Sequence, residues 1–347
     1  MSKSKIRNLK MLVLGLMLCY VFNSCGIKQG EVSAMGKSFL IEINEKINWL
    51  GDTESGAYPE AVVEYFKYYG LGFENEFEGL EHIFGQFQSG EIRLTGHIYK
   101  PMEYNATVIL AHGYFNHCGQ LNHLIRYLLS EGFAVAAFDL PGHGLSGGDR
   151  AAIDDFAQYS RALVDFTDKV MDRLEGPVHF VGHSTGGAAM IDYLLTGKNC
   201  VFDKIILAAP LVHCAGWELS KLSVQEKFQF VKQVPRIFRK NSSDKAFMDF
   251  VKNDDRLQSR HLSLKWMRAL HSWNEKIAGL DSRDRGAMII QGTADSTVDW
   301  RYNVKFLRDK FSAVEVNMVE GACHELFNES SDIREDVFFQ ISNYFED

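Results

Sequence analysis

VHFVGHSTGG, residues 178–187, joins an apolar run to a turn of the form Gly-x-Ser-x-Gly. Ser184 stands at the centre of this turn, with Gly182 and Gly186 two residues to either side. A sharp strand-to-helix turn crowds those two positions, so both favour glycine, and it exposes the serine above the sheet. A phosphate-binding turn is the alternative interpretation. It is disfavoured because no Lys-Ser or Lys-Thr pair follows.

Short apolar runs of the same kind recur along the chain, with helix-like segments between most of them. Two alternating segments, 82–88 and 92–100, flank a turn at Ser89 and Gly90 and predict an antiparallel hairpin. The continuous runs are typical of buried parallel strands; they lie at 106–113, 133–140, 177–184, 204–210, 287–295 and 314–321. Helices are expected at 59–69, 120–130, 153–174, 187–195, 302–311 and 333–345. This alternation predicts an α/β fold, a mostly parallel sheet with helices on both faces.

Residues 211–285 interrupt the rhythm, because they contain helical stretches at 221–233, 242–253 and 262–273 and no clear strand. We interpret this segment, called the cap below, as a helical insertion after the sixth strand. The expected organisation is a signal peptide at 1–24, a leader at 25–80, the first part of the core at 81–210, the cap at 211–285 and the second part of the core at 286–347.

The N-terminus predicts export. Four basic residues precede an apolar run at 11–22, which is long enough for a signal peptide but short for a membrane span. Ser24 before Cys25 resembles a bacterial lipoprotein signal, so we expect Cys25 to be acylated and the protein to be anchored in the cell envelope. An uncleaved anchor and an ordinary signal peptide are the alternatives. Removing this segment lowers the formal charge from −8 to −12, which argues against nucleic-acid binding.

A nucleophilic serine needs a base and a group that orients the base. Asp295 ends one strand and His324 follows the last strand, so both are expected at the sheet edge that carries Ser184. The order serine, aspartate, histidine is the one typical of this architecture. Asp299 and Asp139 are the competing acids; Asp299 is expected to enter a helix, and Asp139 precedes the nucleophile in the chain.

Two backbone N–H groups are expected to form the oxyanion hole, that of Tyr114 after the strand 106–113 and that of Thr185 after the nucleophile. We expect His112 and His183 to support their loops, and His117 and Cys118 to line the entrance. The cysteines show no CxxC spacing, and no metal or organic cofactor is implied.

From about residue 82 to the C-terminus the chain resembles the α/β-hydrolase superfamily, and within it the monoacylglycerol lipase and lysophospholipase-like group, which is similar to the serine aminopeptidases. The resemblance rests on AHGYFNHCGQ, FDLPGHGLSGG, VGHSTGG, LAAPL, QGTADSTVD and GACHELFNE, in the order of the family. It implies Ser184 as nucleophile, Asp295 as acid and His324 as base, with Tyr114 and Thr185 as oxyanion donors. These residues coincide with those chosen above.

The resemblance implies hydrolysis of lipid carboxylic esters, lysophospholipid or monoacylglycerol, and the cap should set the preference. An acyl chain would suit the aromatic residues of the cap, which could equally pack its helices onto the sheet; they include Trp217, Phe228, Phe230, Phe238, Phe247, Phe250, Trp266 and Trp273. A peptidase would need an acidic group for the substrate amine, with Glu218 and Asp249 as candidates. An aminopeptidase, a small-ester esterase and a non-catalytic binding protein are the alternatives.

Overall fold

The computed structural model describes residues 43, 45–50, 58–197, 199–221 and 230–346. The predicted signal peptide 1–24, the predicted acylation site Cys25 and the cap residue Phe228 lie outside these residues. No helix within the described part of the chain is long and apolar enough to cross a membrane.

An eight-stranded sheet forms the centre of the described chain, in the order β1-β2-β4-β3-β5-β6-β9-β10. The hairpin β1–β2 and the pair β2–β4 are antiparallel, and the other neighbours are parallel. The strands are β1 (Glu81–Ser89), β2 (Ile92–Lys100), β3 (Thr107–Ala111), β4 (Ala134–Phe138), β5 (Val178–His183), β6 (Ile205–Ala208), β9 (Arg283–Gly292) and β10 (Phe311–Val319). Every residue of β3, β4, β5 and β6 is buried, as expected for parallel strands covered on both faces.

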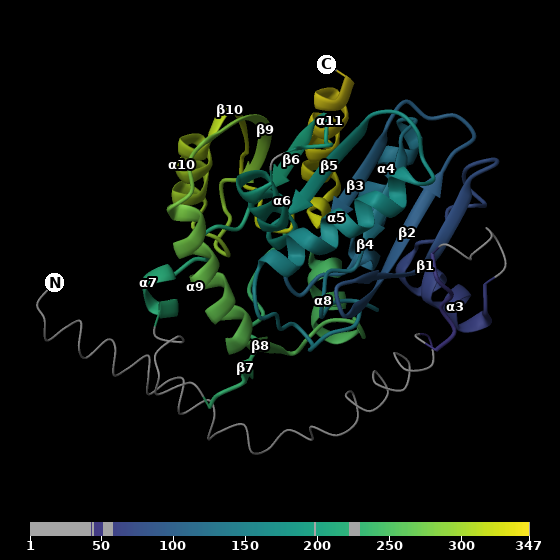
Figure 1. Ribbon diagram of the computed structural model, residues 1–347. Helices are drawn as coiled ribbons and strands as arrows, with labels where there is room; N and C mark the ends of the chain where they lie inside the picture. The colour runs from purple at the N-terminus through teal and green to yellow at the C-terminus, as the bar shows by residue number, and fades with distance from the viewer. Residues whose placement is uncertain (1–42, 44, 51–57, 198, 222–229, 347) are drawn as a thin grey trace, which may run out of the picture. The chain divides into compact units, whose positions relative to one another are not determined.

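Helices cover both faces of this sheet (Figure 1). α5 and α6 contact each other on one face, and α4 contacts α11 on the other. The helices of the core are α4 (Asn122–Ser130), α5 (Ala157–Met171), α6 (Thr185–Thr196), α10 (Trp300–Lys310) and α11 (Ser331–Glu346). The predicted α/β fold is confirmed.

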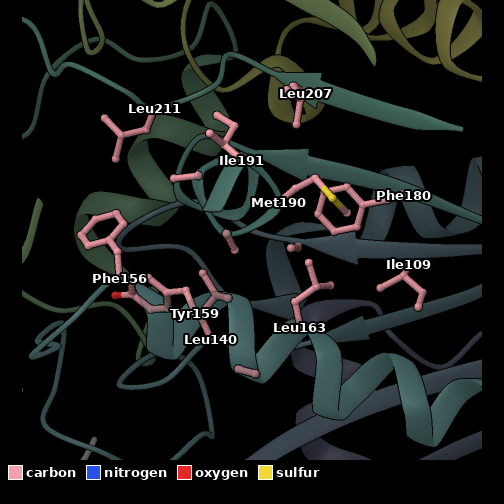
Figure 2. Close-up of a cluster of buried hydrophobic side chains, with 14 of the residues drawn as sticks. Ile109, Leu140, Phe156, Tyr159, Leu163, Phe180, Met190, Ile191, Leu207 and Leu211 are labelled. Atoms are coloured by element: carbon pink, nitrogen blue, oxygen red, sulfur yellow. The ribbon is translucent and has the colours of Figure 1, made fainter. Parts of the chain in front are cut away.

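A cluster of buried hydrophobic side chains lies between α5, α6 and the strands (Figure 2). Leu163 of α5 and Ile191 of α6 are fully buried, as is Ile109 of β3. Both helices place apolar side chains at helical spacing on the face that meets the sheet, and this burial is the main source of their stability. The packing fixes α6, and therefore the turn at its N-terminus.

The described residues of the leader pack against the β1–β2 hairpin and belong to the same compact unit as the core, which begins at Ile43. Its helix α3 (Glu60–Tyr69) buries Tyr65 and Phe66 and ends at Gly70, whose φ is 65°. The Tyr99 hydroxyl of β2 donates a hydrogen bond to the Leu71 carbonyl at 3.0 Å. An amphipathic helix followed by a left-handed glycine explains this local structure.

The cap contains two short strands, so the expectation of no strand between residues 211 and 285 was wrong. β7 (Gln233–Pro235) pairs with β8 (His261–Ser263) in an antiparallel ladder. The described cap also contains α7 (Trp217–Ser220), α8 (Lys245–Asn253) and α9 (Leu264–Ala278), and β9 begins before its predicted end. Of the helix expected at 221–233, residues 222–229 lie outside the described chain, and its last residue belongs to β7. Three-residue strands are too short to show the alternation that identifies a strand.

Candidate active site

Ser184 occupies a strained turn between β5 and α6. Its φ of 50° and ψ of −107° are rare for a residue with a side chain. A Cβ at Gly182 would lie 2.8 Å from the carbonyl carbon of Gly186, and a Cβ at Gly186 would clash with Ala111. The two glycines are therefore required by the close approach of the backbone on either side of the serine.

The structure brings the predicted nucleophile, base and acid together. The Ser184 hydroxyl lies 3.1 Å from His324 Nε2, and His324 Nδ1 donates a hydrogen bond to the Asp295 carboxylate at 2.8 Å. Asp295 follows β9 and His324 follows β10, which are adjacent parallel strands. Their carboxyl ends lie at the edge of the sheet where β5 ends in Ser184, which is why residues so far apart in sequence meet.

The electrostatics of this pair favour a polarised imidazole. Burial alone would raise the pKa of Asp295, but the charge of His324 and its hydrogen bond, with the Thr297 N–H at 2.7 Å, lower that pKa to about 2. Burial alone would lower the pKa of His324, yet the charge and hydrogen bond of Asp295 raise it above its ordinary value. The aspartate therefore remains ionised and fixes the proton on Nδ1, which leaves Nε2 available to accept a proton from the serine.

The two competing acids are engaged elsewhere. Asp299 is the N-cap of α10 and accepts a hydrogen bond from the Tyr302 N–H at 3.3 Å. The Asp139 carboxylate accepts the N–H groups of Cys118 and Leu145, both at 2.7 Å. Each is occupied in organising a loop, and Asp295 is the carboxylate bonded to His324.

The two residues predicted to supply oxyanion N–H groups lie on either side of the nucleophile. Thr185 is the first residue of α6, where helix geometry leaves backbone N–H groups without partners in the helix. Tyr114 follows Gly113, where a Cβ would lie only 3.2 Å from Ser184 Cβ. The Tyr114 ring stacks on Trp266 of the cap at 3.9 Å, and its hydroxyl donates to the Ala151 carbonyl at 2.6 Å.

The histidines near the site differ in their positions. His183 Nε2 donates a hydrogen bond to the His324 carbonyl at 2.9 Å, and His112 Nε2 accepts the Leu140 N–H at 2.9 Å, so both hold loops as expected. His117 and Cys118 do not line an entrance, because both are fully buried. His117 instead donates a hydrogen bond to Asp255 of the cap at 3.0 Å. This pairing could not be found from the sequence, because Asp255 lies 138 residues after His117.

Cap residues 241–244, called the clasp below, bind both loops of the triad, and sequence reasoning missed them. The Thr297 hydroxyl donates to Asn241 Oδ1 at 3.0 Å, and the Glu325 N–H donates to the Asn241 carbonyl at 2.8 Å. The Ser242 hydroxyl donates a hydrogen bond to the Asn328 carbonyl, and the Ser243 N–H donates one to the Glu329 carboxylate. The acid loop and the base loop are therefore linked through one segment of the cap.

The cap covers the site, and two of its tryptophan rings are packed against the core and do not form an open aromatic surface. Ser184 is 5% and His324 4% exposed. Trp266 and Trp273 are buried against Phe156 of the core at 5.6 and 5.0 Å, whereas Phe230 is 84% exposed. These two tryptophans thus attach α9 to the core, which is the packing role left open as the alternative.

The remaining polar candidates do not add to the site. Glu218 is exposed and forms an ion pair with Lys221 at 2.7 Å, and Asp249 is exposed on α8. The four cysteines of the described chain, Cys118, Cys200, Cys214 and Cys323, are free thiols.

Comparisons with known proteins identify a family, relatives and structures to which the chain is similar. The model of the family described as serine aminopeptidase, S33, matches residues 102–331. A monoglyceride lipase from Mus musculus is 25% identical over 69% of this chain and 82% of its own length. The phospholipase YtpA from Bacillus subtilis is 28% identical over 67% of this chain and 92% of its own. A crystal structure of a soluble variant of the monoglyceride lipase from Saccharomyces cerevisiae has a TM-score of 0.66 at 20% identity and covers 75% of this chain and 93% of that one.

Proposed function

The chain belongs to the serine aminopeptidase S33 family of α/β hydrolases, and on that premise we propose that it hydrolyses carboxylic esters of lipids, lysophospholipids or monoacylglycerols. The observation that carries the proposal is the continuous hydrogen-bonded series from Ser184 through His324 to Asp295, built on a strained turn. This arrangement suits a serine nucleophile with a histidine base and an aspartate that orients it.

The proposed reaction begins when His324 Nε2 takes the proton of the Ser184 hydroxyl while its oxygen attacks the ester carbonyl. The tetrahedral intermediate collapses as the carbon–oxygen bond to the alcohol breaks, and His324 gives its proton to the leaving alkoxide. Water then attacks the acyl-enzyme, again with His324 as the base, and releases the fatty acid. Asp295 stays ionised throughout and stabilises the imidazolium that forms in each step.

The oxyanion of both intermediates would be bound by the backbone N–H groups of Tyr114 and Thr185. Thr185 offers an N–H at the N-terminus of α6, and Tyr114 is held in place by its ring contact with Trp266. Loss of one such donor costs about 3–4 kcal/mol of transition-state stabilisation.

Lipid esters are supported as substrates by the relatives and by the placement of the acidic residues of the cap. Two relatives, covered over most of their length, are named monoglyceride lipase and phospholipase. Recognition of a peptide amine needs a carboxylate near the nucleophile, but Glu218 is exposed and paired with Lys221. Asp249 is exposed as well.

The test measures hydrolysis of p-nitrophenyl esters from acetyl to palmitoyl by the full chain in detergent, beside Ser184→Ala. A matched control is Ser130→Ala, an exposed serine whose hydroxyl bonds to the Tyr127 carbonyl. We expect turnover of medium or long chains that falls by several orders of magnitude in Ser184→Ala and not in the control. Cleavage of aminoacyl amides in place of esters, or activity that survives Ser184→Ala, would overturn the proposal.

We further propose that the chain is exported and anchored through a lipid on Cys25. The basic and apolar sequence before Ser24 supports this interpretation. In bacterial cells, labelled palmitate should enter the wild-type chain and not Cys25→Ser, and the variant should leave the membrane fraction. Equal membrane association of the two chains would contradict the anchor.

A further inference from the structure

A buried carboxylate beside the proposed base takes no part in the proposed proton transfers. Glu325 directly follows His324 in the chain and is buried. Its backbone is fixed on both sides, because its N–H donates to the Asn241 carbonyl and its carbonyl accepts the Asn328 N–H, each at 2.8 Å. Burying a carboxylate is costly unless it binds a donor or a charge. The donor that this carboxylate binds therefore indicates what the residue does.

That donor lies on the loop that carries the proposed oxyanion N–H. The Asn116 side-chain amide donates a buried hydrogen bond to the Glu325 carboxylate at 2.8 Å. The Asn116 N–H donates to the Gly113 carbonyl at 3.1 Å and closes a turn over residues 113–116. Tyr114 is the second residue of this turn. The Glu325 carboxylate therefore joins the loop of the proposed base to the turn of the proposed oxyanion donor.

The turn needs such support because its backbone is strained. Phe115, the third residue of the turn, has a φ of 73°, in the left-handed region that favours glycine. A residue with a side chain keeps this conformation only where its surroundings fix it. The guanidinium carbon of Arg236 lies 4.1 Å from the centre of the Phe115 ring, and the hydrogen bond of Asn116 fixes the next residue. Without that bond the turn is free to relax, and the Tyr114 N–H moves with it.

The charge of Glu325 also acts on the ionisable groups around it. Burial lowers the pKa of His324, the charge and hydrogen bond of Asp295 raise it, and the charge of Glu325 adds a smaller rise. Burial lowers the pKa of His183 of β5, whose ring centre lies 4.8 Å from that of His324, and Glu325 opposes this. Arg236 of the cap lines a small cavity with Glu325; burial lowers its pKa to about 10, against the charge of the carboxylate. The carboxylate is thus close enough to the proposed base to affect its titration.

We propose that Glu325 is a positioning residue, whose carboxylate holds Asn116 and thereby keeps the proposed oxyanion donor, Tyr114, in place. The inference rests on the proposed function and adds a residue that lies outside the triad. Because Glu325 belongs to the same loop as the proposed base, its hydrogen bond sets the distance between that base and the oxyanion donor. Both must act on one carbonyl group, and catalysis depends on such placement at the level of about 1 Å.

The first test measures kcat and KM of the full chain in detergent, with the p-nitrophenyl ester that wild type hydrolyses fastest. Asn116→Ala and Glu325→Ala each remove the hydrogen bond. We expect kcat to fall about 10- to 100-fold in both, with KM within about threefold of wild type. The loss falls on kcat because the oxyanion forms only after the serine has attacked. Folded variants that keep the kcat of wild type would overturn the inference.

Glu325→Gln separates position from charge. The glutamine carbonyl can still accept from Asn116, so kcat at high pH should stay within about threefold of wild type, in contrast to Glu325→Ala. Because the charge is lost, the ascending limb of kcat/KM against pH should move to lower pH, by less than in Asp295→Asn. Glu320→Gln, at an exposed position four residues before the proposed base, is the matched control and should change neither value. A limb that stays in place, or a kcat as low as in Glu325→Ala, would contradict the proposed role.

A double-mutant cycle tests whether Asn116 and Glu325 act as a pair. The double variant should lose no more kcat than either single variant, because the second change removes a contact that the first has already broken. Losses that multiply would show two separate effects and would overturn the inference. Should Glu325→Ala fail to fold, Asn116→Asp places a second carboxylate against the first and must lower kcat as Asn116→Ala does. Absence of Ser184-dependent turnover in wild type would instead refute the proposed function, and the inference with it.

Discussion

In the described part of the chain, two buried histidine–aspartate pairs are joined by a hydrogen bond between the imidazole and the carboxylate, and they differ in whether the histidine faces a nucleophile. His324 donates to Asp295 at 2.8 Å, and His117 donates to Asp255 at 3.0 Å. For both aspartates burial acts to raise the pKa, and the paired histidine with further hydrogen bonds lowers it to about 2. Judged by the pair alone, the two regions would be equivalent.

The difference lies in what the second ring nitrogen meets. His324 Nε2 faces the Ser184 hydroxyl at 3.1 Å, whereas His117 Nδ1 accepts the Gly119 N–H at 3.1 Å. Both nitrogens of the His117 imidazole therefore have hydrogen-bond partners, and neither is free to accept a proton from a nucleophile. A buried histidine–aspartate pair becomes a candidate for catalysis only when its other nitrogen points to a reactive group.

Asp255 serves instead as a junction between segments. It accepts hydrogen bonds from Tyr69 at the end of α3 at 3.0 Å, from Gln120 after β3 at 2.6 Å and from the Leu257 N–H of the cap at 3.0 Å. The leader, the core and the cap thus meet at one carboxylate. The expected effect of changing it is on stability.

The largest expected difference between the two pairs is in kcat, when the histidine of each pair is replaced in turn. His324→Gln removes the proposed base, and we expect kcat to fall about 10⁴-fold with the fold retained. His117→Gln should keep kcat within about tenfold of wild type, because that ring touches no reacting atom. Steady-state kinetics on one p-nitrophenyl ester measures both. A loss in His117→Gln as large as that in His324→Gln would contradict the comparison.

The second effect is on folding. Asp255→Ala leaves His117, Gln120 and Tyr69 without their buried acceptor, and we expect a loss of about 3–5 kcal/mol in the free energy of unfolding. Because the pKa of Asp255 is depressed from 3.8 to about 2, its stabilisation is complete above the unfolded value and is lost as pH falls towards about 2.

Urea unfolding at neutral pH and in acid measures this loss. Asp154→Ala, an exposed residue that pairs with Lys265 at 2.9 Å, is the control and should cost less than about 1 kcal/mol. The free energies of unfolding of the two variants should become more similar in acid. If they do not, the ionised carboxylate of Asp255 is not the source of the stabilisation.

The third effect concerns pH. The proposed base must be neutral, and the pKa of His324 is raised above 6.5 by Asp295, so kcat/KM should rise with pH through that raised value and fall about tenfold per unit below it. In Asp295→Asn the residual activity should have its ascending limb at lower pH, since the anion that favours the imidazolium is gone. His117→Gln should leave the limb in place. Profiles of kcat/KM from about pH 5 to about pH 9 test this. If the ascending limb moves in His117→Gln, it reports the titration of His117 and not that of His324, and the prediction is wrong.

The smallest effect should come from Asp299, the acid nearest in sequence to Asp295. Asp299→Ala removes the N-cap of α10 and should cost about 1 kcal/mol of stability. We expect kcat to be unchanged, whereas Asp295→Asn should lose about 10⁴-fold. A larger kinetic loss at Asp299 would reverse the assignment of the acid.

The triad could be located from sequence because each member lies at the end of a strand with a strong local signal. The apolar run before Ser184 and the glycines around it identify the turn without tertiary information. Asp295 and His324 each follow an apolar run that forms a strand, β9 and β10, and these strands are parallel neighbours, so both residues could be placed at the same sheet edge.

The rest could not be found because it depends on pairing between distant segments. β7 and β8 are each three residues long, and only their contact with one another makes them strands. Arg236 and Arg260 meet over one ring although neither belongs to a motif. A polar residue in a cap is usually solvated, and the sequence around Asp255 contains nothing that distinguishes it from an exposed one.

The clasp has a consequence for how substrate preference can change in this fold. Asn241 bonds to the loops of Asp295 and His324, and Ser243 bonds to Glu329 beyond the histidine. The cap is therefore not an interchangeable module: a chimera that exchanged all of residues 211–285 would also remove the supports of the acid and the base. Grafting experiments should therefore keep residues 241–244 with the core, together with Asp255, which bonds to the leader and to the core.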